Sequence, residues 1–330
     1  MLKPGKSIKP GRRNILRALS TAALLPLLNA CGAQQSRPLV VASHVWPGYE
    51  LMFLARREGW LPAESLNLLE TVSATASLAA LADGKADGAA LTLDEVLRAR
   101  AEGIRLTIVL VFDISAGADV VLARPNIHTL ADLAGKRIGV EKTALGELVL
   151  HKLLTAAGLP DEAVSVIPVS PEGHMETWQR GQLDALITYE PTASRLKAED
   201  TRIIYDSRDM PDTIFDVLAV RPEAVSRHQE ALKKLVAGHF RALQHFRSNP
   251  QDAAFRLAGR MHLEAREVLD AYRGLQLPDI RANRSLMDIN KGHLLSAARE
   301  LSQVMARAGL LARPDDLGNL VRTDFLLEED

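Results

Sequence analysis

Polar and aromatic side chains follow the short apolar runs of this sequence. The run Leu39–Ser43 is followed by a histidine and then by Trp46, Tyr49 and Glu50. Carboxylates form strong hydrogen bonds with cationic groups, and aromatic rings offer a face to cations and to planar groups. A Pro-Gly pair holds Trp46 on a turn, which favours a position in a cleft over a plug beneath a loop. These residue types predict a site for a small organic solute.

In an open parallel sheet, ligands bind beyond the carboxyl ends of the strands, where helix N-termini also point. Applied to each predicted strand, this rule selects hydroxyl, carboxyl and aromatic side chains in both halves of the chain. Together with one aspartate from a buried run, the predicted ligand-binding residues are Trp46, Tyr49, Glu50, Ser73, Thr75, Thr92, Asp94, Asp113, Ser115, Glu141, Thr143, Tyr189, Glu190 and Asp216. The sequence predicts no catalytic residue, no metal ligand and no cofactor.

Helix capping is an alternative role for several of these side chains. Ser73, Thr75 and Asp94 stand where helices are predicted to begin, and an N-cap stabilises a helix by about 1 kcal/mol without touching a ligand. Pro191 is typical of the first position of a helix, which makes Glu190 a further N-cap candidate. Both roles remain open for these four residues.

Two aspartates stand inside apolar stretches that are predicted to be strands. Asp119 lies in Ala118–Ala123, and Asp216 lies in Ile214–Val220. A buried carboxylate without a partner is costly. Each aspartate therefore needs a positive charge. A lysine or arginine across the hinge that these two stretches are predicted to form could supply it, and so could a cationic ligand.

Apolar strands and amphipathic helices alternate along the chain and position these side chains. The first four apolar runs lie at 39–43, 66–71, 88–91 and 105–112. This alternation predicts parallel sheets covered on both faces by helices. The pattern begins again near residue 130, and the stretch 84–92 is matched by 181–188, each with a glycine, a turn aspartate and a final threonine. The predicted fold class is α/β with two doubly wound lobes.

The stretches 118–123 and 214–220 are the predicted crossings between the lobes, and two crossing strands form a hinge that could close over a ligand. The alternative is that both belong to one sheet. After about residue 222 the pattern becomes purely helical. The predicted divisions are a signal peptide at 1–30, a tether at 31–37, a first lobe of 38–117 plus 221–330, and a second lobe of 118–220.

The N-terminus has the layout of an export signal. Basic residues at 3–17 precede an apolar stretch that is too short to be a permanent membrane span. The segment Leu28-Asn29-Ala30-Cys31 resembles a bacterial lipobox, which implies that Cys31 is acylated and anchors the chain to a membrane. Arg12 and Arg13 resemble a twin-arginine export motif. The alternative is a plain signal peptide with an incidental cysteine.

Composition excludes several classes of protein. The 330 residues carry a net charge of −1, but six of the 40 basic residues lie in the first thirty positions, which leaves 34 basic against 41 acidic residues. Nucleic-acid binding by the folded part is therefore not expected. The single cysteine excludes an intrachain disulfide, and the nine histidines show no metal-binding spacing.

Six segments between Ser43 and Val220 occur in an order typical of one family: 46–50 (Trp-Pro-Gly-Tyr-Glu), 54–59, 78–84, 113–119, 130–140 and 189–191 (Tyr-Glu-Pro). In them the sequence resembles the substrate-binding proteins of bacterial ABC importers for nitrate, sulfonates, taurine and thiamine precursors. The resemblance implies two lobes around a cleft, with the helices after 228 packed on the first lobe, as in type II periplasmic binding proteins. It also implies an extracytoplasmic monomer that delivers a solute to an ABC permease and its ATPase.

Enzymes share this fold family, but the mature chain has neither a nucleophile motif nor a phosphate loop, so a binding protein is expected. The alternatives are a ligand-sensing domain of a signalling system and a thiamine-precursor (aminopyrimidine) binding protein or enzyme. Many carboxylates and few bases, among them Lys142, surround the predicted cleft. This balance favours an amine-bearing solute, either a taurine-like zwitterion or a cation, over a bare anion such as nitrate.

Overall fold

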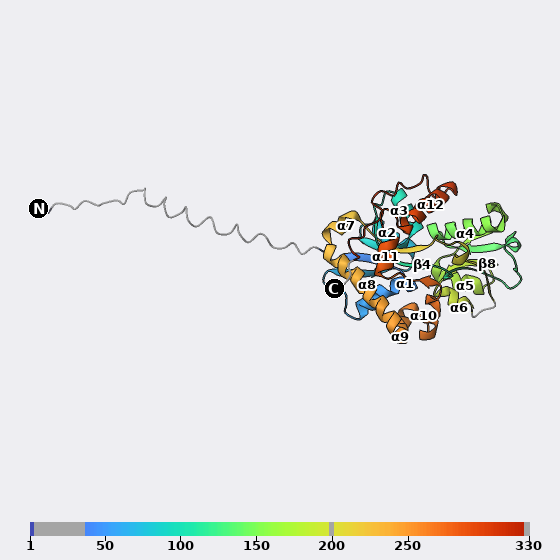
Figure 1. Ribbon diagram of the computed structural model, residues 1–330, viewed down its shortest axis with the longest axis horizontal. Coiled ribbons are helices and arrows are strands. Elements are labelled where there is room, and N and C mark those ends of the chain that lie inside the picture. Colours follow the sequence, from blue (N-terminus) through green and yellow to red (C-terminus); the bar gives the residue numbers. More distant parts are fainter. Residues whose placement is uncertain (3–36, 198–200, 327–330) are drawn as a thin grey trace. The chain divides into compact units, whose positions relative to one another are not determined.

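Two mixed β-sheets organise the residues that the computed structural model describes, which are 1–2, 37–197 and 201–326 (Figure 1). The strand order is β11-β4-β10-β3-β1-β2 in the first sheet and β7-β6-β8-β5-β9 in the second. The predicted signal peptide and Cys31 lie outside the described residues and stay predictions.

The first sheet is built from β1 (Leu39–Ser43), β2 (Leu66–Glu70), β3 (Gly88–Thr92), β4 (Thr107–Ser115), β10 (Phe215–Val220) and β11 (Leu275–Gln276). The second is built from β5 (Asp119–Ala123), β6 (Arg137–Val140), β7 (Ser165–Pro168), β8 (Ala185–Tyr189) and β9 (Arg202–Asp206). In each sheet one antiparallel strand is inserted among parallel ones. Strand β10 runs antiparallel to β3 and β4, and β5 runs antiparallel to β8 and β9.

Strand β10 departs from the predicted division of the chain, which assigned residues 118–220 to the second lobe. It pairs along its length with β3 and β4 in the first sheet, and every residue of the strand is buried. The segments that join the sheets are therefore 116–118 and 207–214, rather than the strands at 118–123 and 214–220. Both edges of β10 and both of its faces are occupied within the first sheet, which fixes it there.

The helices cover both sheets. They are α1 (Pro47–Arg57), α2 (Ala74–Ala82), α3 (Leu93–Ala101), α4 (Ala144–Ala157), α5 (His174–Gln179), α6 (Thr192–Lys197), α7 (Pro222–Arg227), α8 (Gln229–Ser248), α9 (Pro250–Met261), α10 (Ala265–Tyr272), α11 (Ile280–Leu286) and α12 (His293–Arg307). Helices α8, α9 and α10 form a cluster with α1, and α12 packs on α3. The C-terminal helices therefore pack against helices that belong to the first sheet.

The outer edge of β4 is covered by the C-terminal part of the chain. Strand β11 pairs with it at Ile114 and Ser115, and Ile108 exchanges backbone hydrogen bonds with Leu320 and Arg322. Between these points the buried Asn283 side chain accepts a hydrogen bond from the Val111 amide at 2.8 Å. It also donates one to the Val111 carbonyl at 3.0 Å. An exposed edge strand can pair with other chains, and this cover removes that edge.

Replacing Asn283 with leucine leaves two buried backbone groups of β4 without partners. We expect Asn283→Leu to lower the free energy of unfolding by about 2–4 kcal/mol, since each buried unsatisfied group costs about 1–3 kcal/mol. Urea denaturation followed by circular dichroism measures the change. The exposed Asn290 provides the matched control, because Asn290→Leu makes the same chemical change at the surface. Equal midpoints for the two variants would contradict this role.

Candidate functional site

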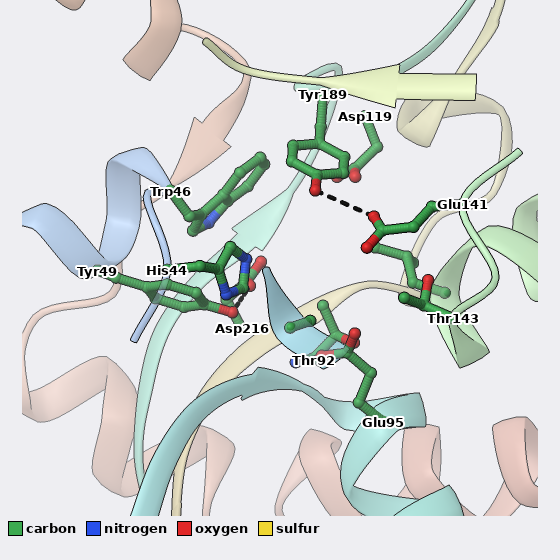
Figure 2. Close-up of a pocket in the computed structure, with 12 residues that line it drawn as sticks. His44, Trp46, Tyr49, Thr92, Glu95, Asp119, Glu141, Thr143, Tyr189 and Asp216 are labelled. Carbon is green, nitrogen blue, oxygen red and sulfur yellow. Dashed lines mark hydrogen bonds between the residues drawn. The ribbon is translucent and has the colours of Figure 1, made fainter. Parts of the chain in front are cut away.

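A small cavity lies where the carboxyl ends of the parallel strands of both sheets meet (Figure 2). It is lined by His44, Trp46, Tyr49, Ala74, Thr92, Glu95, Asp119, Glu141, Thr143, Leu145, Tyr189 and Asp216. Seven of the fourteen predicted ligand-binding residues are among them.

On the first sheet, strand pairing aligns three polar residues in one row. Asp216 of β10 stands directly opposite Thr92 of β3 on one side and Asp113 of β4 on the other. Because β10 is antiparallel, its first residues lie beside the last residues of its neighbours. The Tyr49 hydroxyl donates a hydrogen bond to Asp216 Oδ1, and the indole Nε1 of Trp46 donates one to Asp113 Oδ2 at 3.1 Å.

Gly48 allows the contact between Trp46 and Asp113. A Cβ atom at position 48 would lie 1.7 Å from Asp113 Oδ2 and 3.3 Å from Trp46 Nε1. Any other residue would therefore displace the carboxylate that accepts the indole hydrogen bond. The Trp-Pro-Gly segment of the sequence thus serves to fix the indole at the cavity wall.

On the second sheet, a matching row forms at the same end of the strands. Asp119, the first residue of the antiparallel β5, stands opposite Tyr189, the last residue of β8. The Tyr189 hydroxyl donates a hydrogen bond to Glu141 Oε2 at 3.1 Å, and Glu141 directly follows β6. Thr143 caps α4, its hydroxyl accepting from the Gly146 amide at 3.0 Å.

Aromatic rings from both sheets form the remaining walls. The rings of Trp46 and Tyr189 meet edge to face with centroids 6.0 Å apart, and those of His44 and Tyr49 do so at 5.3 Å. Trp46 and Tyr49 follow β1, whereas Tyr189 ends β8. The cavity is therefore enclosed by rings that belong to different sheets.

Burial dominates the electrostatics of the cavity. It raises the pKa of Glu95 to about 8 and the pKa values of Asp119 and Glu141 to about 7. The pKa of Asp216 is raised well above its usual value by burial and by the neighbouring Asp113. Burial also lowers the pKa of His44 to about 4, so this ring is neutral at physiological pH.

Positive charge is missing from the cavity wall. The lining residues include neither lysine nor arginine. Asp119 keeps one oxygen (Oδ2) without a hydrogen-bond partner among the described residues. Asp216 lies opposite Asp113 on the next strand, and a side-chain hydrogen bond links the two carboxyl groups. The two expected partners of these aspartates are a basic side chain and a cationic ligand, and the cavity wall provides no basic side chain.

Glu50 was expected to bind ligand, but it does not line the cavity. Its side chain is fully buried, and its Oε2 lies 2.7 Å from Nε of Arg260. Burial raises the pKa of Glu50 to about 8, although the nearby Arg260 acts to lower it. The guanidinium of Arg260 also stacks on the Phe53 ring, with its Cζ atom 3.4 Å from the ring centroid. Successive helical residues point about 100° apart, so Tyr49 and Glu50 of α1 face different environments.

The other predicted residues that lie outside the cavity wall have local roles. Ser73 caps α2 by accepting from the Ala76 amide, and Thr75 is exposed on the same helix. The hydroxyl oxygens of Ser115 and Ser207 lie 2.8 Å apart, beside the segments that join the two sheets. Glu190 accepts from the Ser194 amide and pairs with Lys197 at 3.3 Å. Asp94 and Asp113 are fully buried beside the cavity.

Five lining residues were not in the predicted set: His44, Ala74, Glu95, Asp119 and Leu145. Glu95 had a usable signal, because Thr92-x-x-Glu95 is a capping box in which Glu95 Oε2 accepts from the Thr92 amide at 3.0 Å. That bond brings the carboxyl back toward the end of β3. For Asp119 the sequence predicts only a buried acid that needs a partner.

Among the residues that the structure describes, no group of three or more His, Cys, Asp or Glu side chains could hold a metal ion. Within the same residues, no helix is long and apolar enough to cross a membrane.

The fold matches that of periplasmic solute-binding proteins. The alkanesulfonate-binding protein of Xanthomonas axonopodis pv. citri, solved with MOPS bound, superposes over 88% of this chain and 100% of its own, with a TM-score of 0.73 at 17% identity. A desulfurization enzyme superposes over 87% of this chain and 97% of its own, with a TM-score of 0.61 at 18% identity. The predicted fold class is thereby confirmed, and the fold alone does not separate binding proteins from enzymes.

The chain belongs to the NMT1/THI5-like family, whose sequence profile matches residues 46–253. The taurine-binding periplasmic protein of Escherichia coli is 24% identical over 174 residues, which cover 52% of this chain and 54% of that protein. A binding-protein homologue in Brucella abortus is 28% identical over 140 residues, which cover 41% of this chain and 44% of the homologue. The chain thus spans about half the length of these curated relatives.

The raised carboxyl pKa values give the stability of the unliganded protein a pH dependence. Above pH 6.5 the unfolded chain has lost protons that the buried Asp113 and Glu95, each with a pKa of about 8, still hold. We therefore expect the free energy of unfolding to fall between pH 6.5 and 8.5 by about 1–2 kcal/mol for each such carboxyl. Thermal unfolding across this range measures the effect.

Asp113→Asn should flatten this dependence, because the amide oxygen still accepts from Trp46 but does not titrate. The exposed Asp161 gives the control, since Asp161→Asn should leave the slope as it is in the parent protein. An unfolding temperature that rises from pH 6.5 to 8.5 would contradict the assignment of protonated carboxyls.

Proposed function

We propose that this chain is the extracytoplasmic solute-binding protein of an ABC import system, working with a membrane permease and its ATPase. The observation that carries the proposal is the cavity at the facing carboxyl ends of the two sheets, closed by aromatic rings from both. Ligand capture involves hinge closure about the segments 116–118 and 207–214. The binding proteins among its relatives support this role over catalysis, and the protein acts as a monomer.

The ligand is an amine-bearing organic solute. The carboxylates of Glu95, Asp119, Glu141 and Asp216 line the cavity, and none of the lining side chains is a lysine or arginine. An ammonium or a protonated ring would favour the ionised form of these carboxyl groups and pair with it, whereas a bare anion such as nitrate would find no positive charge on the cavity wall. The ring of Trp46 offers a face for cation–π contact or stacking, which also suits an aminopyrimidine.

A zwitterion of the taurine type is the second ligand class that the cavity could accept. The N-termini of α2 and α4 reach the cavity at Ala74 and Leu145, and helix N-termini attract anionic groups. An ammonium among the carboxylates and a sulfonate at these helix ends would satisfy both features. The name of the Escherichia coli relative, a taurine-binding protein, supports this alternative.

Ligand binding is tested on a compound panel by thermal shift. We expect amines and aminopyrimidines to raise the unfolding temperature by several degrees at a hundredfold excess over Kd, about 2.7 kcal/mol of stabilisation, and nitrate and sulfate to leave it unchanged. Trp46→Ala should lower the affinity for an organic ligand about tenfold or more, because the contact with the indole ring is lost. Trp60, which lies outside the cavity, provides the matched control Trp60→Ala. A strong shift with nitrate would contradict the amine assignment.

Attachment to the membrane rests on Cys31, which precedes a short polar tether. Acyl chains contribute about 0.8 kcal/mol per buried CH₂, so two or more hold a soluble domain at a bilayer. We expect Cys31→Ser to move the protein from the membrane fraction to the soluble periplasmic fraction without lowering its unfolding temperature. Ser36→Ala, a change in the same tether, should leave the fractionation as it is. A parent protein that is already soluble, with a free Cys31 thiol, would contradict lipid anchoring.

A further inference from the structure

The indole of Trp46 lines the cavity, and two elements determine where it stands. Its Nε1 donates a hydrogen bond to Asp113 of β4, and the turn that carries it leads directly into α1 at Pro47. The Trp46 carbonyl accepts from the amides of Tyr49 and Glu50 at 3.0 and 3.2 Å, which ties the turn to the helix. The position of the ring therefore depends on where the start of α1 lies relative to β4.

Helix α1 is packed between the first sheet and the C-terminal helices. Met52 and Phe53 belong to the apolar cluster of the sheet. Leu51, Leu54 and Ala55 belong to a second cluster, which they form with residues of α8, α9 and α10. Figure 1 shows these three helices beside α1. The C-terminal helices are thus one of the two layers that fix the position of α1.

One polar contact joins the C-terminal helices to the start of α1. The hydroxyl of Tyr272, the last residue of α10, donates a hydrogen bond to the carbonyl of Pro47. Tyr272 is buried, and its ring lies against that of Phe246 with centroids 4.3 Å apart. Burial and nearby carboxyl groups raise the pKa of Tyr272 well above its usual value, so the hydroxyl keeps its proton. A buried and fixed donor therefore holds the residue next to Trp46.

The segment after α10 braces the acceptor of the indole hydrogen bond. Strand β11 pairs with the last two residues of β4, directly after Asp113. The carbonyl of Gly274 accepts from the Ala116 amide at 2.8 Å. A Cβ atom at position 274 would come within 2.5 Å of a backbone atom, so this approach requires glycine. The stretch 272–276 therefore contacts both the turn that carries Trp46 and the strand that carries Asp113.

We infer, building on the proposed function, that Tyr272 is a positioning residue of the binding site: its hydroxyl holds the start of α1 so that the Trp46 ring stands at the cavity wall. Without this bond the turn is free to move away from β4, which weakens the indole hydrogen bond to Asp113. Tyr272 does not line the cavity, and it lies beyond residue 253, where the match to the family profile ends. The C-terminal helices thus shape a site whose lining residues all lie at or before Asp216.

The indole N–H signals of the three tryptophans test this role without any ligand. A two-dimensional ¹⁵N–¹H NMR spectrum of the tryptophan-labelled protein gives one indole signal for each, and Trp46→Phe, Trp60→Phe and Trp178→Phe assign them. We expect Tyr272→Phe to shift the Trp46 signal and to speed the exchange of its indole hydrogen with solvent about threefold to tenfold, the effect of losing one hydrogen bond. The signals of Trp60 and Trp178 should stay unchanged.

Tyr205→Phe is the matched control, because it makes the same chemical change in β9 of the second sheet. It should leave all three indole signals unchanged, and circular dichroism melts measure the stability of both variants separately. A tyrosine that only stabilises the fold would lower the unfolding temperature of Tyr272→Phe without moving the Trp46 signal, and that result overturns the inference. Equal changes at all three indoles indicate general loosening and overturn it as well.

The inference and the proposed function fail in different ways. An unchanged Trp46 signal in Tyr272→Phe overturns the positioning role, while solute binding measured on the thermal-shift panel stands. A panel without any binding compound overturns the proposed function, while a shifted Trp46 signal still supports the control of the ring by Tyr272. A shifted signal together with solute binding supports both.

Discussion

The insertion of β10 between β3 and β4 is the constraint on which the site depends. The chain returns from the second sheet and enters the first at its centre, so it must run antiparallel to the strands on either side. Its first residues then lie at the carboxyl ends of β3 and β4, which is how Asp216 comes to face Thr92 and Asp113. Strand β5 does the same in the second sheet with Asp119. Two hinge-side strands thus each bring an acid to the cavity.

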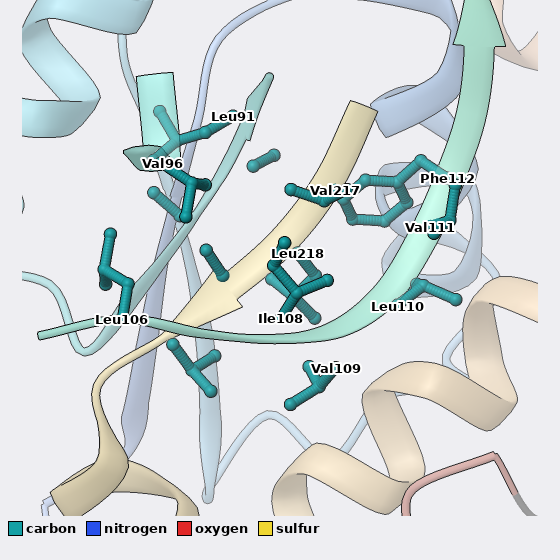
Figure 3. Packing of buried hydrophobic residues seen from close by; sticks show 14 of the residues in the cluster. Leu91, Val96, Leu106, Ile108, Val109, Leu110, Val111, Phe112, Val217 and Leu218 are labelled. Carbon is teal, nitrogen blue, oxygen red and sulfur yellow. The ribbon is translucent and has the colours of Figure 1, made fainter. Parts of the chain in front are cut away.

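The strands themselves were predictable because burial on both faces leaves a continuous apolar run. The runs predicted at 39–43, 66–71 and 88–91 agree within one residue with β1, β2 and β3. Figure 3 shows the reason at β4 and β10, where Ile108, Val111 and Val217 are packed among other buried side chains. The partners of β10 were not predictable, because pairing between strands about a hundred residues apart leaves no local pattern in the sequence.

The site was predictable where a residue directly follows a strand, and less so where a helix intervenes. Thr92, Glu141 and Tyr189 lie at strand ends, so the sheet alone fixes their direction. In a helix, neighbouring residues diverge by about 100°, and which one meets the cavity depends on how the helix packs. The rule therefore chose Asp94 where Glu95 lines the wall, and it included Glu50 together with Tyr49.

The same carboxylates bear on closure in the proposed hinge motion. The ion pair between Arg98 and Glu147 joins α3 to α4 across the cleft, but the two side chains are 31% and 36% exposed. Ion pairs between partly exposed side chains stabilise a structure by only about 0–1 kcal/mol. Buried acids at the facing sheet ends oppose closure of the empty protein, because closing removes their water. A ligand shifts a conformational equilibrium only by its difference in affinity for the two states. Since the surface ion pair is too weak to offset the desolvation of several carboxyl groups, the bound ligand must supply most of that difference.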